Sequence, residues 1–266
     1  MLTTERLCIG LKKDKKESTL IVKDVSFSLG SGQSLTILGQ SGCGKTMTCS
    51  AIMDLLDRQM FFVKGKILFD GRNLPDLSGK EKRSIYGRRI AYIPQNPMTA
   101  LDPSMRTGRQ MDETLKLHTA LDKETRREKI FSSLKTAGLS DPERIWKSYP
   151  YMLSGGMLQR VLVAMSVMTD ADLVIADEPT TALDVVHRNE IIDEFIRLRS
   201  GGASVIVVTH DFAAALRLGG RLLVMKDGSI LEEGETMSVF KSPKHEYTKS
   251  LITESQLSQG GAYALC

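Results

Sequence analysis

The chain has 266 residues, enough for one large domain or two small ones with a buried core. Its hydrophobic content of 41% and charged content of 26% are ordinary for a soluble globular protein. A net charge of +4 does not indicate nucleic acid as a partner, although it would suit a surface near anionic lipid. No apolar run approaches the length of a membrane span, and the charged N-terminus is not a signal peptide.

Cysteine usage predicts reduced thiols and a cytoplasmic location. The four cysteines show no C-x-x-C spacing, which argues against a zinc site or an iron–sulfur cluster: Cys8, Cys43, Cys49 and Cys266. Cys43 lies inside a glycine-rich segment, residues 39–46, where a disulfide would block function. If the protein works at a membrane, we expect it to work from the surface.

Strands alternate with helices along most of the chain. The hydrophobic pattern predicts strands, in chain order, at residues 2–11, 18–29, 35–38, 66–71, 89–93, 171–175 and 204–209. Helices are predicted over residues 45–56 and 187–199, and a hairpin over 221–232 turns at Asp227-Gly228. Residues 105–168 carry mostly helical patterning, so a long helical insertion interrupts the alternation.

Continuous apolar strands separated by helices predict an α/β fold with a mostly parallel sheet buried on both faces. Ligands of such sheets bind beyond the carboxyl ends of the strands. Polar segments directly follow four of the predicted strands: residues 39–46, Gln95, Asp177-Glu178 and His210. We therefore expect these segments to gather at one edge of the sheet.

The segment between the strand at 35–38 and the following helix fits the phosphate-loop pattern G-x-x-x-x-G-K-[ST]. Its residues are Gly39, Gln40, Ser41, Gly42, Cys43, Gly44, Lys45 and Thr46. Glycines let the backbone wrap an anion, and the helix points its positive dipole end at it. Lys45 can reach the phosphates and the Thr46 hydroxyl can hold Mg²⁺. The alternative is a glycine turn before an ordinary helix.

Two carboxylates follow the apolar strand at 171–175. Asp177 can accept hydrogen bonds from Mg²⁺-bound water, and Glu178 is a candidate for positioning or deprotonating an attacking water. The alternative is a helix start after a turn. Taken alone, His210 indicates only a histidine at a strand end, and Gln95 indicates almost nothing.

A second anion site is predicted at Ser154-Gly155-Gly156. Ser154 can cap the helix that follows, and the two glycines expose backbone N–H groups at its start. Because the chain has one phosphate loop, a second anion site suggests the nucleotide of a partner. The alternative is an ordinary turn.

Taken together, these motifs resemble the ATP-binding subunits of ABC transporters, over nearly the whole chain. The resemblance implies an ABC-type P-loop ATPase with a mostly parallel sheet core, an antiparallel β subdomain and a helical insertion. It implies one domain over residues 1–254, followed by a loose tail over 255–266. Within the domain, residues 1–95 and 169–254 would form the core with its β subdomain, and residues 96–168 the helical subdomain.

The resemblance also implies roles for the site residues in binding and hydrolysing ATP. The phosphate loop would hold the phosphates, while Thr46, Gln95 and Asp177 would arrange Mg²⁺ and its waters. Glu178 would activate water, and His210 would contact the γ-phosphate. The family usually stacks the adenine on an aromatic residue before the second strand. This chain has no aromatic residue before Phe27, so residue 11 or 21, both aliphatic, would pack on the base instead.

The remaining motifs are implied to act across a dimer of ATPase subunits. Ser154, Gly155 and Gly156 would close on ATP bound to the opposite subunit, and Asp184 would cross the interface. ATP would thus hold two subunits together, and hydrolysis would release them. The helical insertion would grip the membrane subunits and transmit that motion.

Residues 95–103, 149–150 and 243–251 look like the dipeptide/oligopeptide/nickel importer branch of the family. Residues 153–160 and the run Asp184-Val-Val look like the nickel-importer subunit that pairs with a second, different ATPase, and the chain lacks the C-terminal cysteine cluster of many peptide importers. The implied partners are that second ATPase subunit, two transmembrane permease subunits and an extracytoplasmic substrate-binding protein. The implied location is peripheral, on the cytoplasmic face of the bacterial inner membrane.

Three alternatives remain. The first is the ATPase subunit of a dipeptide or oligopeptide importer, because no residue in these motifs binds the cargo. The second is a soluble ABC-type ATPase acting in DNA repair or translation, which its single module and compact insertion disfavour. The third is a catalytically silent partner, which the presence of Glu178 and His210 disfavours.

Overall fold

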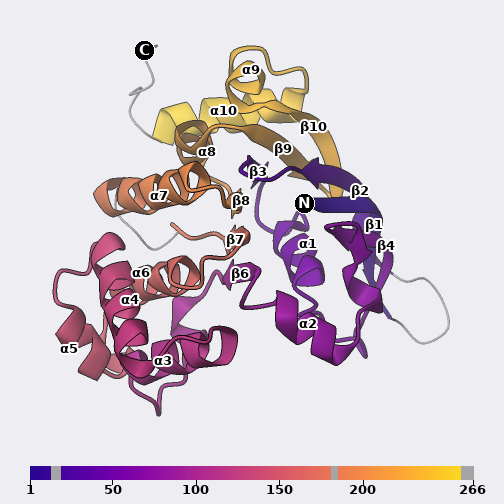
Figure 1. Cartoon of the computed structure of the whole chain (residues 1–266). Coiled ribbons are helices and arrows are strands. Elements are labelled where there is room, and N and C mark those ends of the chain that lie inside the picture. Colours follow the sequence, from indigo (N-terminus) through magenta and orange to yellow (C-terminus); the bar gives the residue numbers. More distant parts are fainter. Residues whose placement is uncertain (13–18, 181–184, 259–266) are drawn as a thin grey trace. The chain divides into compact units, whose positions relative to one another are not determined.

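The computed structural model describes residues 1–12, 19–180 and 185–258, with side chains described up to Ser255. It divides the chain into two compact units. Unit 1 comprises Met1–Leu77 and Ile206–Cys266, and unit 2 comprises Ser78–Val205. Figure 1 shows their elements. Unit 1 is therefore built from both ends of the sequence, whereas unit 2 is continuous.

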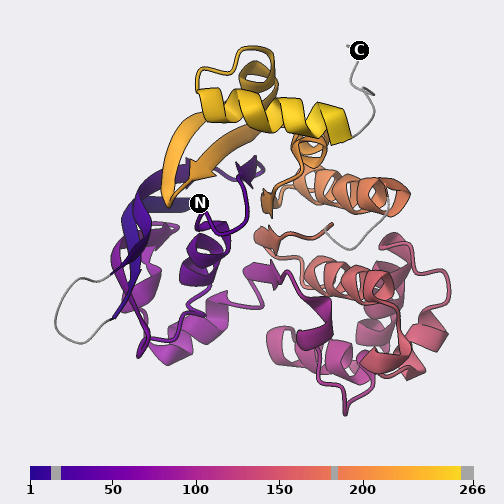
Figure 2. The same ribbon diagram turned by 180° about the vertical axis from the view of Figure 1, so that it is seen from behind.

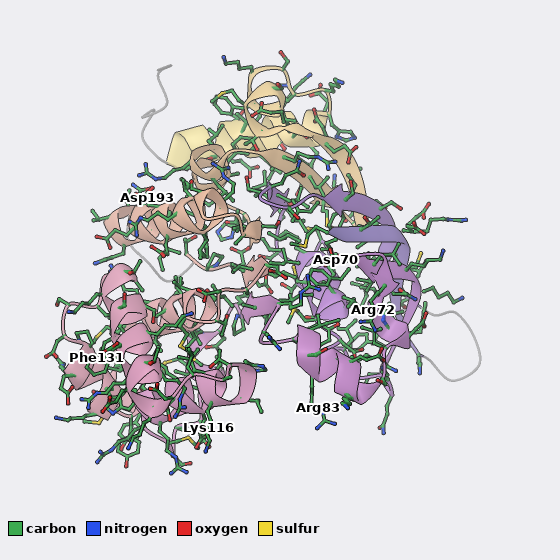
Figure 3. The ribbon with its side chains drawn as sticks, in the orientation of Figure 1. Asp70, Arg72, Arg83, Lys116, Phe131 and Asp193 are labelled. Carbon is green, nitrogen blue, oxygen red and sulfur yellow. The ribbon has the colours of Figure 1, made fainter. Side chains whose placement is uncertain are left out.

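One sheet of unit 1 is antiparallel, with strand order β2-β1-β4-β5. Its strands are β1 (Leu2–Leu11), β2 (Leu20–Leu29), β4 (Phe61–Phe69) and β5 (Arg72–Asn73). The β4–β5 turn is closed by Asp70 and Gly71, with φ of 49° and 77°. Figure 3 labels Asp70, in that turn, and Arg72, the first residue of β5. An Asp-Gly pair suits this position because both residues occupy the left-handed region.

Within unit 1, a second sheet contributes strands in the order β10-β9-β3-β8. These strands are β3 (Ser34–Leu38), β8 (Ser204–Thr209), β9 (Arg221–Lys226) and β10 (Ser229–Glu235). Every residue of β3 and β8 is buried, as expected for strands covered on both faces. β3 runs parallel to β9, with Leu35 opposite Arg221 and Leu38 opposite Val224. The boundary with unit 2 falls inside β8.

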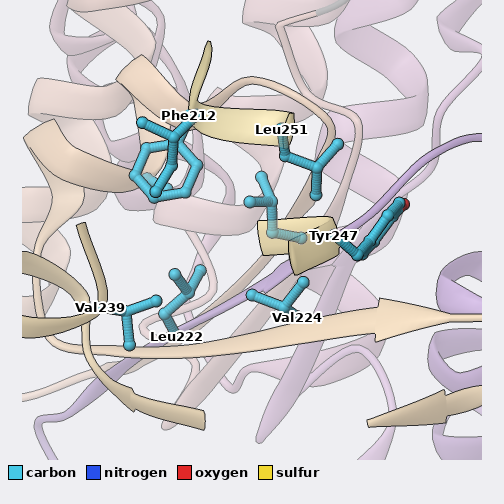
Figure 4. Packing of buried hydrophobic residues seen from close by; sticks show 9 residues of the cluster. Phe212, Leu222, Val224, Val239, Tyr247 and Leu251 are labelled. Atoms are coloured by element: carbon cyan, nitrogen blue, oxygen red, sulfur yellow. The ribbon is translucent and has the colours of Figure 1, made fainter. Parts of the chain in front are cut away.

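The α-helices in the described part of unit 1 are α1 (Lys45–Ile52), α8 (Phe212–Leu218), α9 (Thr236–Lys241) and α10 (Glu246–Ser258). Figure 2 shows α10 beside α8. In the same view, α9 and α10 lie along β9 and β10. Their shared core is shown in Figure 4. It consists of Leu38, Phe212, Ala215, Leu222, Val224, Val239, Tyr247, Leu251 and Ile252. Tyr247 is the one polar side chain in this otherwise apolar cluster.

Unit 2 combines a parallel pair of strands, β6 (Ile90–Ile93) and β7 (Leu173–Asp177), with most of the helices. The helices are α2 (Gly79–Ile85), α3 (Thr107–His118), α4 (Lys123–Thr136), α5 (Pro142–Lys147), α6 (Gly155–Val167) and α7 (Val185–Ser200). Arg126 of α4 is mostly buried and pairs with Asp112 of α3 at 2.6 Å. None of the helices in the described residues is long and apolar enough to cross a membrane.

The predicted α/β class, the antiparallel subdomain and the helical insertion are confirmed. The predicted helix over residues 45–56 ends earlier, at Ile52, because Asp54 adopts a left-handed φ of 55°. Helix α10 continues to Ser258, four residues into the segment expected to be a tail. His118 is half-buried against Gly87, where a Cβ atom would lie 2.5 Å from its Nε2. The predicted domain boundaries at residues 95 and 168 stay predictions.

Candidate functional site

The glycine-rich loop in unit 1 connects β3 to α1 and needs its glycines for two different reasons. Gly42 and Gly44 have φ of 83° and 102°, which side chains other than hydrogen rarely tolerate. At Gly39 the limit is space, since a Cβ atom there would lie 2.3 Å from the Met225 carbonyl oxygen on β9. Backbone packed this closely keeps its N–H groups in fixed directions.

Lys45, the first residue of α1, folds back under the loop. Its side chain is only 5% exposed, and its Nζ donates to the carbonyl oxygens of Gly39, at 2.6 Å, and Gln40, at 3.1 Å. No side-chain group caps the first turn of α1, because the N-cap residue is Gly44. The loop thus combines an ammonium group, closely wrapped backbone and a helix N-terminus, which is the donor set that fits a polyphosphate.

A metal held at this loop would depend largely on oxygen atoms of the ligand. No cluster of three or more His, Cys, Asp or Glu side chains in the described part of the chain is arranged to bind a metal. Mg²⁺ commonly binds one or two protein groups together with substrate phosphates, so a threonine hydroxyl at Thr46 suits it. The residues present therefore fit a magnesium–nucleotide complex.

The β9–β10 hairpin and the start of β2 support the loop from behind. The Gly228 N–H donates to the Cys43 carbonyl oxygen at 3.1 Å, and the Lys23 N–H donates to the Gly228 carbonyl oxygen at 2.7 Å. Gly228 has φ of 84°, and a Cβ atom there would lie 2.2 Å from the Ile21 carbonyl oxygen. A Cβ atom on Gly44 would also lie 3.2 Å from that oxygen. Ile21, one of the two aliphatic candidates for base contact, is thus next to the loop.

We predict that Cys43 reacts slowly with alkylating agents, with or without nucleotide. A Cβ atom on Gly39 would lie 2.7 Å from its Sγ, so the thiol lies beneath the loop. Burial raises the pKa of the Cys43 thiol, and the nearby Lys45 charge only partly offsets this. Iodoacetamide labelling at pH 7.5, followed by peptide mass analysis, should modify half-buried Cys8 well before Cys43. Urea-unfolded protein is the control, and rapid Cys43 labelling that ATP blocks would contradict this placement.

In unit 2, the carboxyl end of β7 carries two buried acidic residues. Asp177 ends the strand, and the Tyr92 hydroxyl of β6 lies 3.5 Å from its Oδ2. Glu178 follows with a side chain only 6% exposed and φ of 48°. A glutamate in the left-handed region is strained, and such strain is concentrated at functional sites. The sequence did not point to Tyr92, because a tyrosine in a short apolar strand reads as a core residue.

The Ser154-Gly155-Gly156 segment begins helix α6 as predicted. The Ser154 hydroxyl oxygen accepts a hydrogen bond from the Met157 N–H at 3.3 Å. Apart from its chain neighbours and its own helix backbone, no atom of the described residues lies within 4 Å of a Cβ added at Gly155. Arg160 fixes the helix, since its guanidinium donates to the Gly138 carbonyl oxygen and pairs with Glu190 at 2.5 Å.

The other predicted site residues lie where their strands end. Gln95 is exposed, two residues beyond β6 in unit 2, and His210 is exposed, directly after β8 in unit 1. Asp184 lies outside the described residues. Unit 1 therefore carries the phosphate loop and His210, and unit 2 carries Gln95, the Ser154 segment and the two carboxylates. The prediction that they form one site stays a prediction.

Known proteins resemble this chain over most of its length. The family model described as ABC transporter matches residues 22–181. The chain belongs to the ABC transporter family. It is 38% identical, over 254 residues, to the metal-staphylopine import system ATP-binding protein CntD of Staphylococcus aureus, covering 95% of this chain and 92% of that one. It is 42% identical to the dipeptide transport ATP-binding protein DppD of Bacillus subtilis, covering 87% and 70%.

Solved structures agree with this ABC assignment. A dimeric ATP-binding cassette in a post-hydrolysis state, bound to ADP and Pi, matches with a TM-score of 0.78 and 28% identity. The match covers 89% of this chain and 99% of that one. The chain therefore has the ABC ATPase fold and is an ATP-hydrolysing member of the family.

Proposed function

We propose that this protein is the ATP-hydrolysing subunit of a membrane importer of nickel ions or nickel chelates. The observation that carries the proposal is the glycine-rich loop curled around Lys45, because its donors suit the phosphates of ATP. The relatives named for metal-staphylopine import and dipeptide transport support an importer. They also correspond to the two cargo classes, metal and peptide, that the sequence left open.

The proposed mechanism assigns a task to each residue. Bound Mg-ATP supplies the phosphoanhydride bond and a cation that neutralises its oxygens. With Mg-ATP bound, Lys45 would exchange the loop carbonyls for the phosphates, and Thr46, Gln95 and Asp177 would hold the metal and its waters. Glu178 accepts a proton from the attacking water, and the imidazole of His210 donates a hydrogen bond to the γ-phosphate. Once ATP is bound, these donors are in place and stabilise the transition state without further reorganisation.

The proposed assembly contains a second ATPase subunit, two transmembrane permease subunits and an extracytoplasmic substrate-binding protein. The Ser154-Gly155-Gly156 segment binds the nucleotide of the second ATPase subunit, and Asp184 crosses that interface. Cargo recognition belongs to the partners, and this chain works peripherally on the cytoplasmic face of the bacterial inner membrane. Co-purification with membrane subunits separates this proposal from a soluble ABC ATPase.

Uptake measured in cells that carry Glu178→Gln at the native locus tests the cargo. We expect uptake of labelled nickel to fall at least tenfold, because slow ATP hydrolysis would then limit transport. Uptake of a labelled dipeptide should be unchanged, because under this proposal the importer does not carry dipeptides. Glu128→Gln, the same change at an exposed position of α4, is the matched control. Loss of dipeptide uptake, alone or together with nickel uptake, would replace the nickel assignment with a peptide or broader one. Survival of both activities would overturn it.

A further inference from the structure

Tyr247 lies in the first turn of α10, far along the chain from the phosphate loop. Its side chain is 9% exposed, and its ring packs in the core cluster with Val224 and Leu251. Figure 4 shows the phenol oxygen pointing away from that cluster. The oxygen accepts a hydrogen bond from the Gln40 N–H, at 3.1 Å. An apolar ring thus carries one polar atom to the backbone of the loop.

The β9–β10 hairpin contacts both Tyr247 and the loop. The Lys226 Nζ lies 4.9 Å from the centre of the Tyr247 ring, within the range of a cation–π contact. Two residues further on, the Gly228 N–H donates to the Cys43 carbonyl oxygen. Burial raises the pKa of the Tyr247 hydroxyl, so it keeps its proton at neutral pH. The loop is therefore fixed at two backbone positions, Gln40 and Cys43.

Glu232 of β10 anchors the segment that carries Tyr247. Its buried carboxylate accepts the N–H groups of Lys244, at 2.8 Å, and His245, at 3.1 Å. Burial alone would raise the pKa of Glu232, but these donors lower it, so the anchor stays ionised. The His245 Nδ1 accepts the Tyr247 N–H at 3.2 Å. The start of α10 is thus tied to the hairpin before the helix begins.

The two sides of Gln40 are held by different groups. Its N–H is bound by Tyr247, and its carbonyl oxygen accepts the Lys45 ammonium. If Lys45 turned to a phosphate, it would release the carbonyl oxygens of Gly39 and Gln40, whereas the Tyr247 bond does not involve Lys45. We propose that Tyr247 is a positioning residue, which keeps the first residues of the phosphate loop in their nucleotide-binding shape. This inference rests on the proposed role of residues 39–46.

Tyr247→Phe removes the hydroxyl and keeps the buried ring. Without the bond, nucleotide must order the loop itself, so we expect Kd and KM for Mg-ATP to rise about threefold to tenfold, the worth of one hydrogen bond. We expect kcat to stay within about twofold, since saturating nucleotide restores the loop. In the nucleotide-free full chain, amide exchange at Gln40 should accelerate by a similar factor. Thr253→Val, which removes an exposed hydroxyl from the same helix, is the control.

Unchanged Kd together with unchanged exchange at Gln40 would overturn the inference, as would a fall in kcat at constant KM. Glu232→Gln gives a second route, because it weakens the anchor of α10 and leaves Tyr247 in place; we expect a smaller rise in Kd. If Lys45→Ala binds Mg-ATP like the wild type, the nucleotide role of the loop fails instead. Exchange at Gln40 in Tyr247→Phe then still reports on the contact itself.

Discussion

Replacing Glu178 by glutamine is expected to lower kcat for ATP hydrolysis by about 10²–10⁴-fold, the usual contribution of a general base. The amide has almost the same shape but cannot accept the proton of the attacking water. The equilibrium Kd for Mg-ATP should stay unchanged, because the proposed role of Glu178 begins after binding. Steady-state hydrolysis and nucleotide binding, measured on one preparation of the assembled complex, check both expectations.

The structural setting of Glu178 makes this test specific. Its strained backbone, with φ of 48°, costs on the order of 1–3 kcal/mol, and glutamine keeps that strain. A loss of hydrolysis in Glu178→Gln would therefore result from losing the carboxylate's chemistry and not from a change in backbone strain. Glu128→Gln on the exposed face of α4 should hydrolyse ATP normally. If Glu178→Gln did so too, the catalytic assignment would be wrong.

Lys45→Ala is expected to weaken Mg-ATP binding about 100-fold. Two charge-assisted hydrogen bonds to phosphate oxygens are worth about 1.5–3 kcal/mol each, and part of this is offset by the bonds that Lys45 makes to Gly39 and Gln40 in the free loop. The loss should appear in Kd, measured by titration calorimetry with a non-hydrolysable analogue.

The matched control for this prediction is Lys116→Ala, an exposed lysine of α3 that Figure 3 labels. It removes the same charge from the chain without touching the loop, so its Kd should equal that of the wild type. Thermal unfolding of both variants separates lost binding from lost folding. Wild-type affinity in a folded Lys45→Ala protein would show that the loop is not the nucleotide site.

Hydrophobic patterns in the sequence correctly predicted strands whose formation depends on residues close together in the chain. The expected strands at residues 2–11 and 204–209 match β1 and β8, because both segments are rich in apolar or β-branched residues. The end of α1 was predicted wrongly because Leu55 and Leu56 continue an apolar pattern. The chain turns at Asp54 instead, and Leu55 is 59% exposed. A positive φ on a residue other than glycine leaves no mark in hydrophobic periodicity.

Residues of the candidate site likewise differ in whether the sequence could predict their geometry. The phosphate loop and the Ser154 cap were predicted because their geometry depends on consecutive residues. Tyr247 was missed because its partner Gln40 lies 207 residues earlier. The pattern of an amphipathic helix predicts that such a tyrosine is a core residue. Only the tertiary structure shows that its hydroxyl contacts a backbone N–H.

Unit 1 is built from two separate stretches of the chain, and this limits when its parts can assemble during synthesis. The phosphate loop is synthesised early, but β9, the hairpin and α10 that support it come from the last stretch of unit 1, Ile206–Cys266. Unit 2, one continuous stretch, is fully synthesised in between. A ribosome-bound chain therefore carries the loop sequence long before it can form the loop's supports, and nucleotide cannot meet a finished binding loop until those supports have been synthesised.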